Sequence, residues 1–305
     1  MRIRVRTAIV LAVLTVFAVP AAPAHAGFPG QPSTIVFWSD RNSSSQLFTM
    51  GPNGKNEQPV GAGIDGFPGQ LSPDGTRIAF VSSAGPGDGN EVWVVDVDGS
   101  NAVELTTTGQ YIFDPSWNPA GTKILFSVWV PPASSLELFT VRASGGTPQR
   151  ITHSSAVDEY SPVWSPDGKW IAFSANNDKD PVFNYDIYRV RPDGTGRERV
   201  TDTPDRYESS PDWSADGSRI SYTVFVDGSE RTDVMTIQPD GTGARNITKG
   251  VNLDVENAIW LPNGRIVFDA RPIAGDSEIW AISPDRTGLL QLTDNDASDE
   301  VSYVT

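Results

Sequence analysis

The stretch S-P-V-W-S-P-D-G-K-W-I-A-F-S, residues 161–174, decides the fold because variants of it return along the chain at a nearly constant interval. Its tryptophan recurs in register, with a leucine in the first copy, at Leu71, Trp117, Trp164, Trp213 and Trp260. Its glycine recurs, at spacings of 46, 47, 49 and 47 residues, as Gly75, Gly121, Gly168, Gly217 and Gly264. Such a period indicates an array of similar supersecondary units.

The segment Ser165-Pro166-Asp167-Gly168 has the composition of a tight turn. Proline presets φ at the second position, aspartate hydrogen-bonds its own backbone, and glycine adopts the left-handed conformation. The other copies keep this chemistry, with N-P-A-G at 118–121, S-A-D-G at 214–217 and L-P-N-G at 261–264. We therefore expect the turn aspartates to be structural rather than catalytic.

Each copy divides into four short β-strands, called A to D in chain order. Strand A ends at the tryptophan position, and strand B after the turn has apolar residues on both faces, which indicates a sheet covered on both sides. Strand C is expected at 91–95, 137–141, 186–190, 233–237 and 278–282. A second tight turn then leads to a short strand D, which is expected to end at Leu105-Thr106, Ile151-Thr152, Val200-Thr201, Ile247-Thr248 and Leu292-Thr293.

Four antiparallel strands per repeat predict an all-β fold, a β-propeller with WD-like blades. A parallel β-helix would need a shorter repeat, and a β-sandwich would not repeat so regularly. The N-terminal region offers strands B, C and D at 35–37, 46–50 and 57–60, but no strand A. Residues 299–305 align with 158–164 and can supply that strand. The sequence therefore predicts six blades, closed by pairing of the C-terminal strand with the N-terminal partial blade, which removes exposed sheet edges.

The first residues have the three-part layout of a secretory signal peptide. Arg2, Arg4 and Arg6 precede an apolar run over residues 8–19, and Ala24-His25-Ala26 follows. We expect residues 1–26 to be removed and residues 27–305 to form one secreted or periplasmic propeller domain. The apolar run is shorter than the roughly 20 residues that span a bilayer, so no membrane span is expected in the mature chain.

The charge and the cysteine count exclude several kinds of partner. The chain has 23 basic and 38 acidic residues, a net charge of −15, and loss of the three leader arginines would make it about −18. A field of this sign repels phosphate backbones, so nucleic acid is not an expected partner, whereas cations and basic protein surfaces are compatible with it. The absence of cysteine excludes disulfides and thiolate metal sites. We expect a monomer.

The series W-S-P-D-G-x-x-I-A-F-S, D-I-Y-R-V-x-P-D-G-T-G and R-V-T within residues 164–201 resembles the propeller repeat of the TolB family. The resemblance extends over five copies and covers nearly all of residues 27–305. It implies a six-bladed propeller of the bacterial envelope or secreted fraction that serves mainly as a surface for other proteins. About eight residues separate the expected cleavage site from the first strand, so no domain is expected before the propeller.

Candidate binding residues lie on the face formed by the B–C loops and the D–A crossings, opposite the short A–B and C–D turns. The B–C loops expected at 82–90, 128–136 and 175–185 differ in sequence, and variable loops on a rigid scaffold are the usual place for recognition. The D–A crossings carry acids and tyrosines at equivalent positions near the channel mouth, namely Asp65, Tyr111, Asp158, Glu159, Tyr207, Glu208, Asp254, Glu256, Asp299 and Glu300.

This partial ring of carboxylates has two interpretations. Convergent negative charge would attract a cation or a basic peptide. An oxygen-only ligand set would suit Ca²⁺ rather than Zn²⁺, and no other cofactor is expected. Alternatively, the acids accept backbone hydrogen bonds in the crossings as a structural part of the repeat.

The sequence lacks the residues that most classes of catalytic site need. After the expected leader the one histidine is His153, which is expected to be exposed after a strand D, and no G-x-S-x-G motif occurs. Two hypotheses remain. The first is a non-catalytic scaffold that binds a protein or cell-envelope component through its variable face. The second is a carbohydrate-active hydrolase or lyase that uses carboxylates at the channel mouth as acid and base.

Overall fold

The computed structural model describes residues 34–39, 46–60, 67–82, 89–131, 135–154, 157–176, 184–204, 206–225, 231–271, 276–295 and 298–304. The expected signal peptide lies outside these ranges. Within them, no helix is long and apolar enough to cross a membrane.

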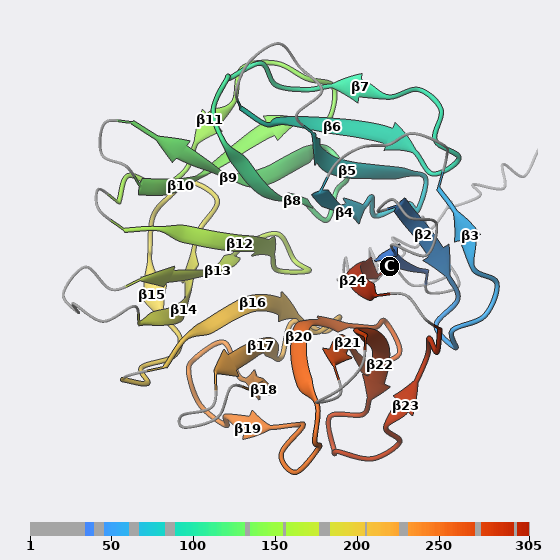
Figure 1. Cartoon of the computed structure of the whole chain (residues 1–305). Helices are drawn as coiled ribbons and strands as arrows, with labels where there is room; N and C mark the ends of the chain where they lie inside the picture. The colour runs from blue at the N-terminus through green and yellow to red at the C-terminus, as the bar shows by residue number, and fades with distance from the viewer. Residues whose placement is uncertain are drawn as a thin grey trace, which may run out of the picture.

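Six four-stranded antiparallel sheets follow one another around a ring in chain order (Figure 1). Blade 1 consists of β24 (Asp299–Val304), β1 (Ile35–Ser39), β2 (Gln46–Met50) and β3 (Gln58–Pro59). Blade 2 consists of β4 (Phe67–Leu71), β5 (Arg77–Ser82), β6 (Glu91–Asp96) and β7 (Val103–Glu104). Blade 3 consists of β8 (Ile112–Trp117), β9 (Lys123–Val130), β10 (Ser135–Arg142) and β11 (Gln149–Arg150).

The second half of the ring repeats this order. Blade 4 consists of β12 (Glu159–Trp164), β13 (Ile171–Asn176), β14 (Tyr185–Val190) and β15 (Glu198–Arg199). Blade 5 consists of β16 (Glu208–Trp213), β17 (Ile220–Phe225), β18 (Thr232–Ile237) and β19 (Arg245–Asn246). Blade 6 consists of β20 (Asp254–Trp260), β21 (Ile266–Arg271), β22 (Glu278–Ile282) and β23 (Leu290–Gln291). The predicted six-bladed propeller is confirmed.

The ring closes as predicted, because the C-terminal strand takes the place of strand A in blade 1. β24 pairs antiparallel with β1, with Ser39 opposite Asp299 and Ile35 opposite Val304. It also contacts β4 of blade 2 and β20 of blade 6. The innermost strands of all six blades thus follow one another around the axis, while the two-residue strands D lie at the rim (Figure 1).

The A–B turns are built as their composition predicts. The glycines of the five copies have φ between 65° and 80°. In blade 4 the Ser165 hydroxyl donates to Asp167 Oδ1 at 2.7 Å and accepts the Trp170 N–H at 2.9 Å. Partial burial pushes the pKa of Asp167 up, but hydrogen bonds from Ser165 and Lys169 outweigh it, so the pKa lies below its ordinary value. This aspartate is a structural part of its turn.

Strand D is shorter than predicted and ends before each apolar-threonine pair. The threonine hydroxyl accepts the hydrogen bond from a strand C amide that a backbone carbonyl of a longer strand D would have accepted. In blade 2, Thr106 Oγ1 accepts the Val92 N–H at 2.9 Å and donates to the Glu91 carboxylate at 2.6 Å. The same amide-to-hydroxyl bond joins Leu138 to Thr152, Ile187 to Thr201, Val234 to Thr248 and Ile279 to Thr293.

The loop predicted at 128–136 is also shorter than expected. β9 and β10 continue until Val130 pairs with Ser135, and Val128 and Leu136 are buried in the extended hairpin. Apolar alternation beyond the usual strand end stabilises these extra pairs. Asn176 and Tyr185, at the ends of another predicted loop, likewise pair with each other as strand residues.

The hydrophobic core lies between the blades. One cluster joins Ala172 and Ile187 of blade 4 to Trp213, Ile220 and other residues of blade 5. Phe126 and Phe173 of strand B have no exposed surface. Each blade therefore buries the apolar face of its neighbour, which explains why strand B is apolar on both sides.

Candidate functional site

The propeller has two functionally different faces. The loop face carries the B–C loops and the D–A crossings, and the turn face carries the A–B and C–D turns. Strand A is the innermost strand of each blade and begins at the loop face, so the starts of these strands lie around the central axis at that face (Figure 1).

Each innermost strand that follows a crossing contains a β-bulge, which redirects side chains along the channel. In β12 the pairing with β13 shifts between Tyr160 and Val163. The bulge residues of blades 3 to 6 have left-handed φ values of 49° to 52°, and all are short and polar: Asp114, Ser161, Ser210 and Asn257. Short polar residues tolerate this conformation better than β-branched ones.

Asp114 connects two of these bulges across the channel wall. Its Oδ2 accepts the Ser161 N–H at 2.9 Å and the Ser161 hydroxyl at 3.3 Å, which joins blade 3 to blade 4. Solvent reaches Asp114, but protein atoms of the channel wall surround it. This desolvation raises its pKa, and the two hydrogen bonds offset only part of the effect.

Three tyrosines from neighbouring elements form a continuous row on the loop face. Tyr160 of β12 and Tyr185 of β14 have ring centroids 5.8 Å apart, and Tyr185 and Tyr207 have centroids 4.8 Å apart. Tyr207 precedes β16 of the next blade, and a backbone bridge ties it to Tyr185. Burial raises the pKa of all three hydroxyls, so they stay neutral donors at ordinary pH.

Tyr207 of this row and three further aromatic side chains on the loop face are exposed. Tyr111 is 51% exposed, Phe113 36%, Tyr207 43% and Phe225 44%. Tyr111 and Phe113 lie at the start of strand A in blade 3, and Phe225 lies at the loop-face end of β17. We call the six residues Tyr111, Phe113, Tyr160, Tyr185, Tyr207 and Phe225 the loop-face aromatics. Exposed aromatics gathered on one face are typical of a protein-binding surface.

Two of the predicted crossing acids have partners in the preceding blade. Asp158 Oδ1 accepts the Leu136 N–H at 3.0 Å, and Asp254 Oδ1 accepts the Thr232 N–H at 2.9 Å. Both amides lie at the start of a strand C. These contacts fit the structural interpretation of the acids.

Two of the predicted glutamates are buried between blades. Glu159 has no exposed surface, accepts the hydroxyls of Thr152 and Ser154 at 2.5 and 2.9 Å, and lies 3.2 Å from Arg197. Desolvation dominates these contacts and raises the pKa of Glu159 to about 7. Glu208 is 1% exposed, accepts the Thr203 hydroxyl at 2.5 Å, and also has a raised pKa because of burial.

The remaining predicted residues have varied environments. Asp299 is fully buried and accepts Asn295 Nδ2 at 2.8 Å, whereas Glu256 is exposed. Asp65 and the side chain of Glu300 lie outside the described residues. Within the described ranges no three acidic or histidine side chains form a group that could hold a metal ion. Calcium binding and ligand binding by these acids stay predictions.

Four residues at this face were not predicted from the sequence, namely Phe113, Asp114, Tyr160 and Phe225. A signal for Asp114 existed, because the four copies carry Asp, Ser, Ser or Asn three residues before the tryptophan. The aromatics belong to different strands and come together through blade packing, so no local pattern indicates them.

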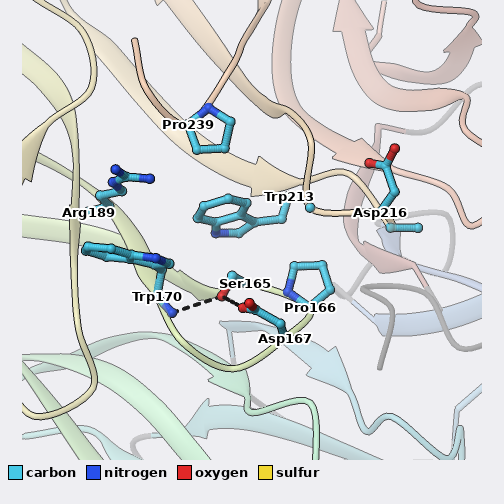
Figure 2. Close-up of a pocket in the computed structure, with 10 residues that line it drawn as sticks. Ser165, Pro166, Asp167, Trp170, Arg189, Trp213, Asp216 and Pro239 are labelled. Atoms are coloured by element: carbon cyan, nitrogen blue, oxygen red, sulfur yellow. Dashed lines mark hydrogen bonds between the residues drawn. The ribbon is translucent and has the colours of Figure 1, made fainter. Parts of the chain in front are cut away.

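A pocket of about 380 Å³ lies on the turn face between blades 4 and 5. Its apolar lining includes Trp170, Trp213, Pro166 and Pro239, and its charged lining includes Arg189, Asp167 and Asp216. Figure 2 shows the indole of Trp213 beside that of Trp170, with Arg189 on one side of the pocket and Asp216 on the other. This volume lies within the usual range of small-ligand sites.

A family model described as the TolB beta propeller domain matches residues 67–301. The chain belongs to the TolB β-propeller family. Among solved structures, TolB from Acinetobacter baumannii superposes with a TM-score of 0.73 at 20% identity, over 89% of this chain and 67% of that chain. At that identity the likeness shows the shared fold.

Curated relatives match shorter segments of this TolB-family chain. The "Protein TolB homolog" of Chlorobium chlorochromatii is 30% identical over 144 residues, which are 46% of this chain and 31% of the relative. The "Uncharacterized peptidase YuxL" of Bacillus subtilis is 27% identical over 139 residues, 34% of this chain and 21% of the relative. This chain thus spans less than a third of the length of either relative.

Proposed function

We propose that this TolB-family propeller is a secreted or periplasmic, non-catalytic scaffold that binds a protein of the cell envelope through its loop face. The observation that carries the proposal is the set of loop-face aromatics, four of which are more than a third exposed. Aromatic side chains supply large contact areas at protein interfaces. Curated relatives include proteins named "Tol-Pal system protein TolB", which supports an envelope protein as the partner.

The charge around this surface favours a basic partner. Asp114 lies close enough to Tyr160 and Tyr207 to affect their pKa values, and Asp158 likewise affects Tyr160 and Tyr185. The whole chain has a net charge of −15. A partner segment with arginine or lysine beside apolar residues would match both the charge and the rings, and its association rate would fall with salt.

The test is affinity capture from the native envelope and culture medium with residues 27–305 as bait. The double variant Phe113→Ser/Tyr207→Ser should lose the partner that the parent protein retains, because it removes two exposed rings from one surface. A loss of tenfold or more is expected if the rings are interface hot spots, which cost about 2 kcal/mol each on truncation.

The matched control is Leu289→Ser/Leu290→Ser, which changes two residues that are 40% and 46% exposed beside or on the rim strand β23. This control should retain the partner. Equal capture by both double variants would contradict a loop-face interface. Turnover of a carbohydrate that is lost on Glu159→Gln or Asp158→Asn would instead favour the hydrolase or lyase alternative.

A further inference from the structure

We propose that the pocket between blades 4 and 5 on the turn face binds a guanidinium group, such as the side chain of an arginine from another molecule. This site lies on the opposite face from the loop-face aromatics, so it is independent of the function proposed above. Blade 4 departs from the repeat at this pocket.

Trp170 stands at a position where the other four full copies have a basic residue. The equivalent residues, directly before the first isoleucine of strand B, are Arg77, Lys123, Arg219 and Arg265. Between blades 2 and 3, the Arg77 guanidinium carbon lies 4.9 Å from the ring centroid of Trp117. Trp213 is the repeat equivalent of Trp117. The chain itself therefore places an arginine at this repeat position on one such interface. Between blades 4 and 5 the position holds Trp170, and the guanidinium beside it is that of Arg189 in strand C.

The two A–B turns at this interface carry more acids than the turns at its counterparts. The third turn residue in blades 2 to 6 is Asp74, Ala120, Asp167, Asp216 and Asn263. Only the pair of turns in blades 4 and 5 has an acid on both sides, beside a repeat position that holds Trp170 in place of a basic residue. This combination is complementary to an external cation.

Asp216 has one carboxylate oxygen at the pocket that is available to accept a hydrogen bond. Its Oδ1 accepts the Ser214 hydroxyl at 2.7 Å and the Ser218 amide and hydroxyl at 3.0 and 2.8 Å. Among the described residues, its Oδ2 has no hydrogen-bond or salt-bridge partner. Asp167, in contrast, is paired with exposed Lys169 at 3.0 Å. Asp216 is therefore the group that can receive the guanidinium N–H donors.

The positive charge of Arg189 does not exclude a second cation. Glu198 accepts from Arg189 Nε at 2.8 Å and from Nη2 at 2.5 Å, which neutralises it within blade 4. The guanidinium carbons of Arg189 and Arg191 lie 4.3 and 5.1 Å from the Trp170 ring centroid, so this indole already contacts two guanidinium groups of its own blade. The indole of Trp213 and the carboxylate of Asp216 are then the groups that would receive an external guanidinium. Pro166 and Pro239 give the pocket apolar walls that suit the methylene stem of an arginine.

Three features of blade 4 depart together from the repeat at this place. Where blade 4 has Arg189, the other full copies have Val94, Thr140, Thr236 and Ala281. Where it has Glu198, they have Val103, Gln149, Arg245 and Leu290. The Trp170–Arg189–Glu198 set is therefore specific to the blade that forms the pocket and is not repeat geometry.

The test is a titration of ¹⁵N-labelled protein, residues 27–305, with N-acetylarginine amide, followed by the indole N–H signals of Trp170 and Trp213. N-acetylcitrulline amide, which has the same shape without the charge, is the control ligand. We expect saturable shifts of these two signals with arginine amide and none with citrulline amide. A Gly-Arg-Gly peptide that binds more tightly than the amide would indicate a protein side chain as the ligand, and the reverse a small guanidinium compound.

Three variants complete the test. Trp170→Arg restores the residue type of the other copies, so the protein should fold and its own guanidinium should abolish binding. Binding is followed by the Trp213 signal, and unchanged indole signals of Trp117 and Trp260, in other blades, report an intact fold. Asp216→Asn keeps the Oδ1 acceptor of the turn and should weaken binding about fivefold, the upper range for an exposed ion pair. Asp74→Asn, the same change in blade 2, should have no effect. Equal shifts with arginine and citrulline amides, no shifts with arginine amide, or undiminished binding by Trp170→Arg would each overturn the proposal.

Discussion

Asp212 is the buried carboxyl that joins the innermost strands of blades 5 and 6. It is 9% exposed and accepts the Trp260 N–H at 2.7 Å. Desolvation raises its pKa to about 7, although backbone amides of Trp260 and Trp213 partly offset the effect. In blade 2 the equivalent Gln70 accepts the Trp117 N–H and carries no charge. A neutral acceptor is thus sufficient for this contact.

We predict that Asp212→Asn removes a pH-dependent part of the stability. An ordinary Asp releases its proton near pH 3.8, whereas the folded protein holds the Asp212 proton until about pH 7. The folded state is therefore favoured most below the unfolded-state pKa, and this contribution is lost as the pH rises from about 4 to 7, by up to about 1.4 kcal/mol per pH unit.

Urea unfolding of both proteins between pH 4 and 8 measures the effect. The parent protein should lose stability relative to Asp212→Asn as the pH rises. Glu159, whose pKa is also raised to about 7, acts in both proteins and cancels in the comparison. A difference between the two proteins that is constant with pH would show that Asp212 does not titrate in this window.

At the scale of elements, the two kinds of turn differ in what surrounds their glycines. Gly168 of the A–B turn has φ 68° and no atom within 4 Å of an added Cβ. Gly194 of the C–D turn has φ 82°, and an added Cβ would lie 2.3 Å from the Ile151 carbonyl oxygen of blade 3. Both need glycine for conformation, but only the C–D turn packs tightly against the preceding blade.

We predict that Gly194→Ala destabilises the protein much more than Gly168→Ala. The change at Gly168 costs only the left-handed conformation, about 1–2 kcal/mol. The change at Gly194 adds a backbone clash that must separate two blades, for a total of roughly 2–5 kcal/mol. Thermal unfolding of the two variants makes the comparison, and equal midpoints would mean that the C–D turn can move without cost.

The elements could be predicted from the sequence because each copy repeats the same local rules. The turn Ser165–Gly168, the apolar alternation of strand B and the glycine positions agree from blade to blade. The end of strand D could not be predicted from the sequence. It depends on whether the Val92 N–H donates to the Thr106 hydroxyl or to a backbone carbonyl of strand D, and composition does not decide between these two acceptors.

At the scale of the whole molecule, the repeat does not predict the direction of the side chains at the start of strand A. Glu159 occupies the predicted position, yet its carboxylate contacts Thr152 and Ser154 within the protein. Conversely, Tyr160, Tyr185 and Tyr207 come from different strands and two blades, and their contact follows from strand twist and blade packing. A site formed by several repeats therefore depends on tertiary structure, whereas a departure within one repeat, such as Trp170, is visible in the sequence.

Ring closure gives the last prediction, because one strand joins the two ends of the chain. Deletion of residues 298–305 removes β24, which pairs with β1 and contacts β4 and β20. β1 would then become an exposed edge, and the apolar faces of blades 2 and 6 would lose a neighbour. We expect the thermal midpoint to fall by roughly 10 °C or more, since several kcal/mol of packing and pairing are lost and each shifts a protein of this size by about 2–4 °C. A synthetic peptide of residues 298–305 should restore part of the loss by pairing with the open edge. A truncated protein that unfolds at the parent midpoint would show that the remaining five complete blades hold the ring without this strand.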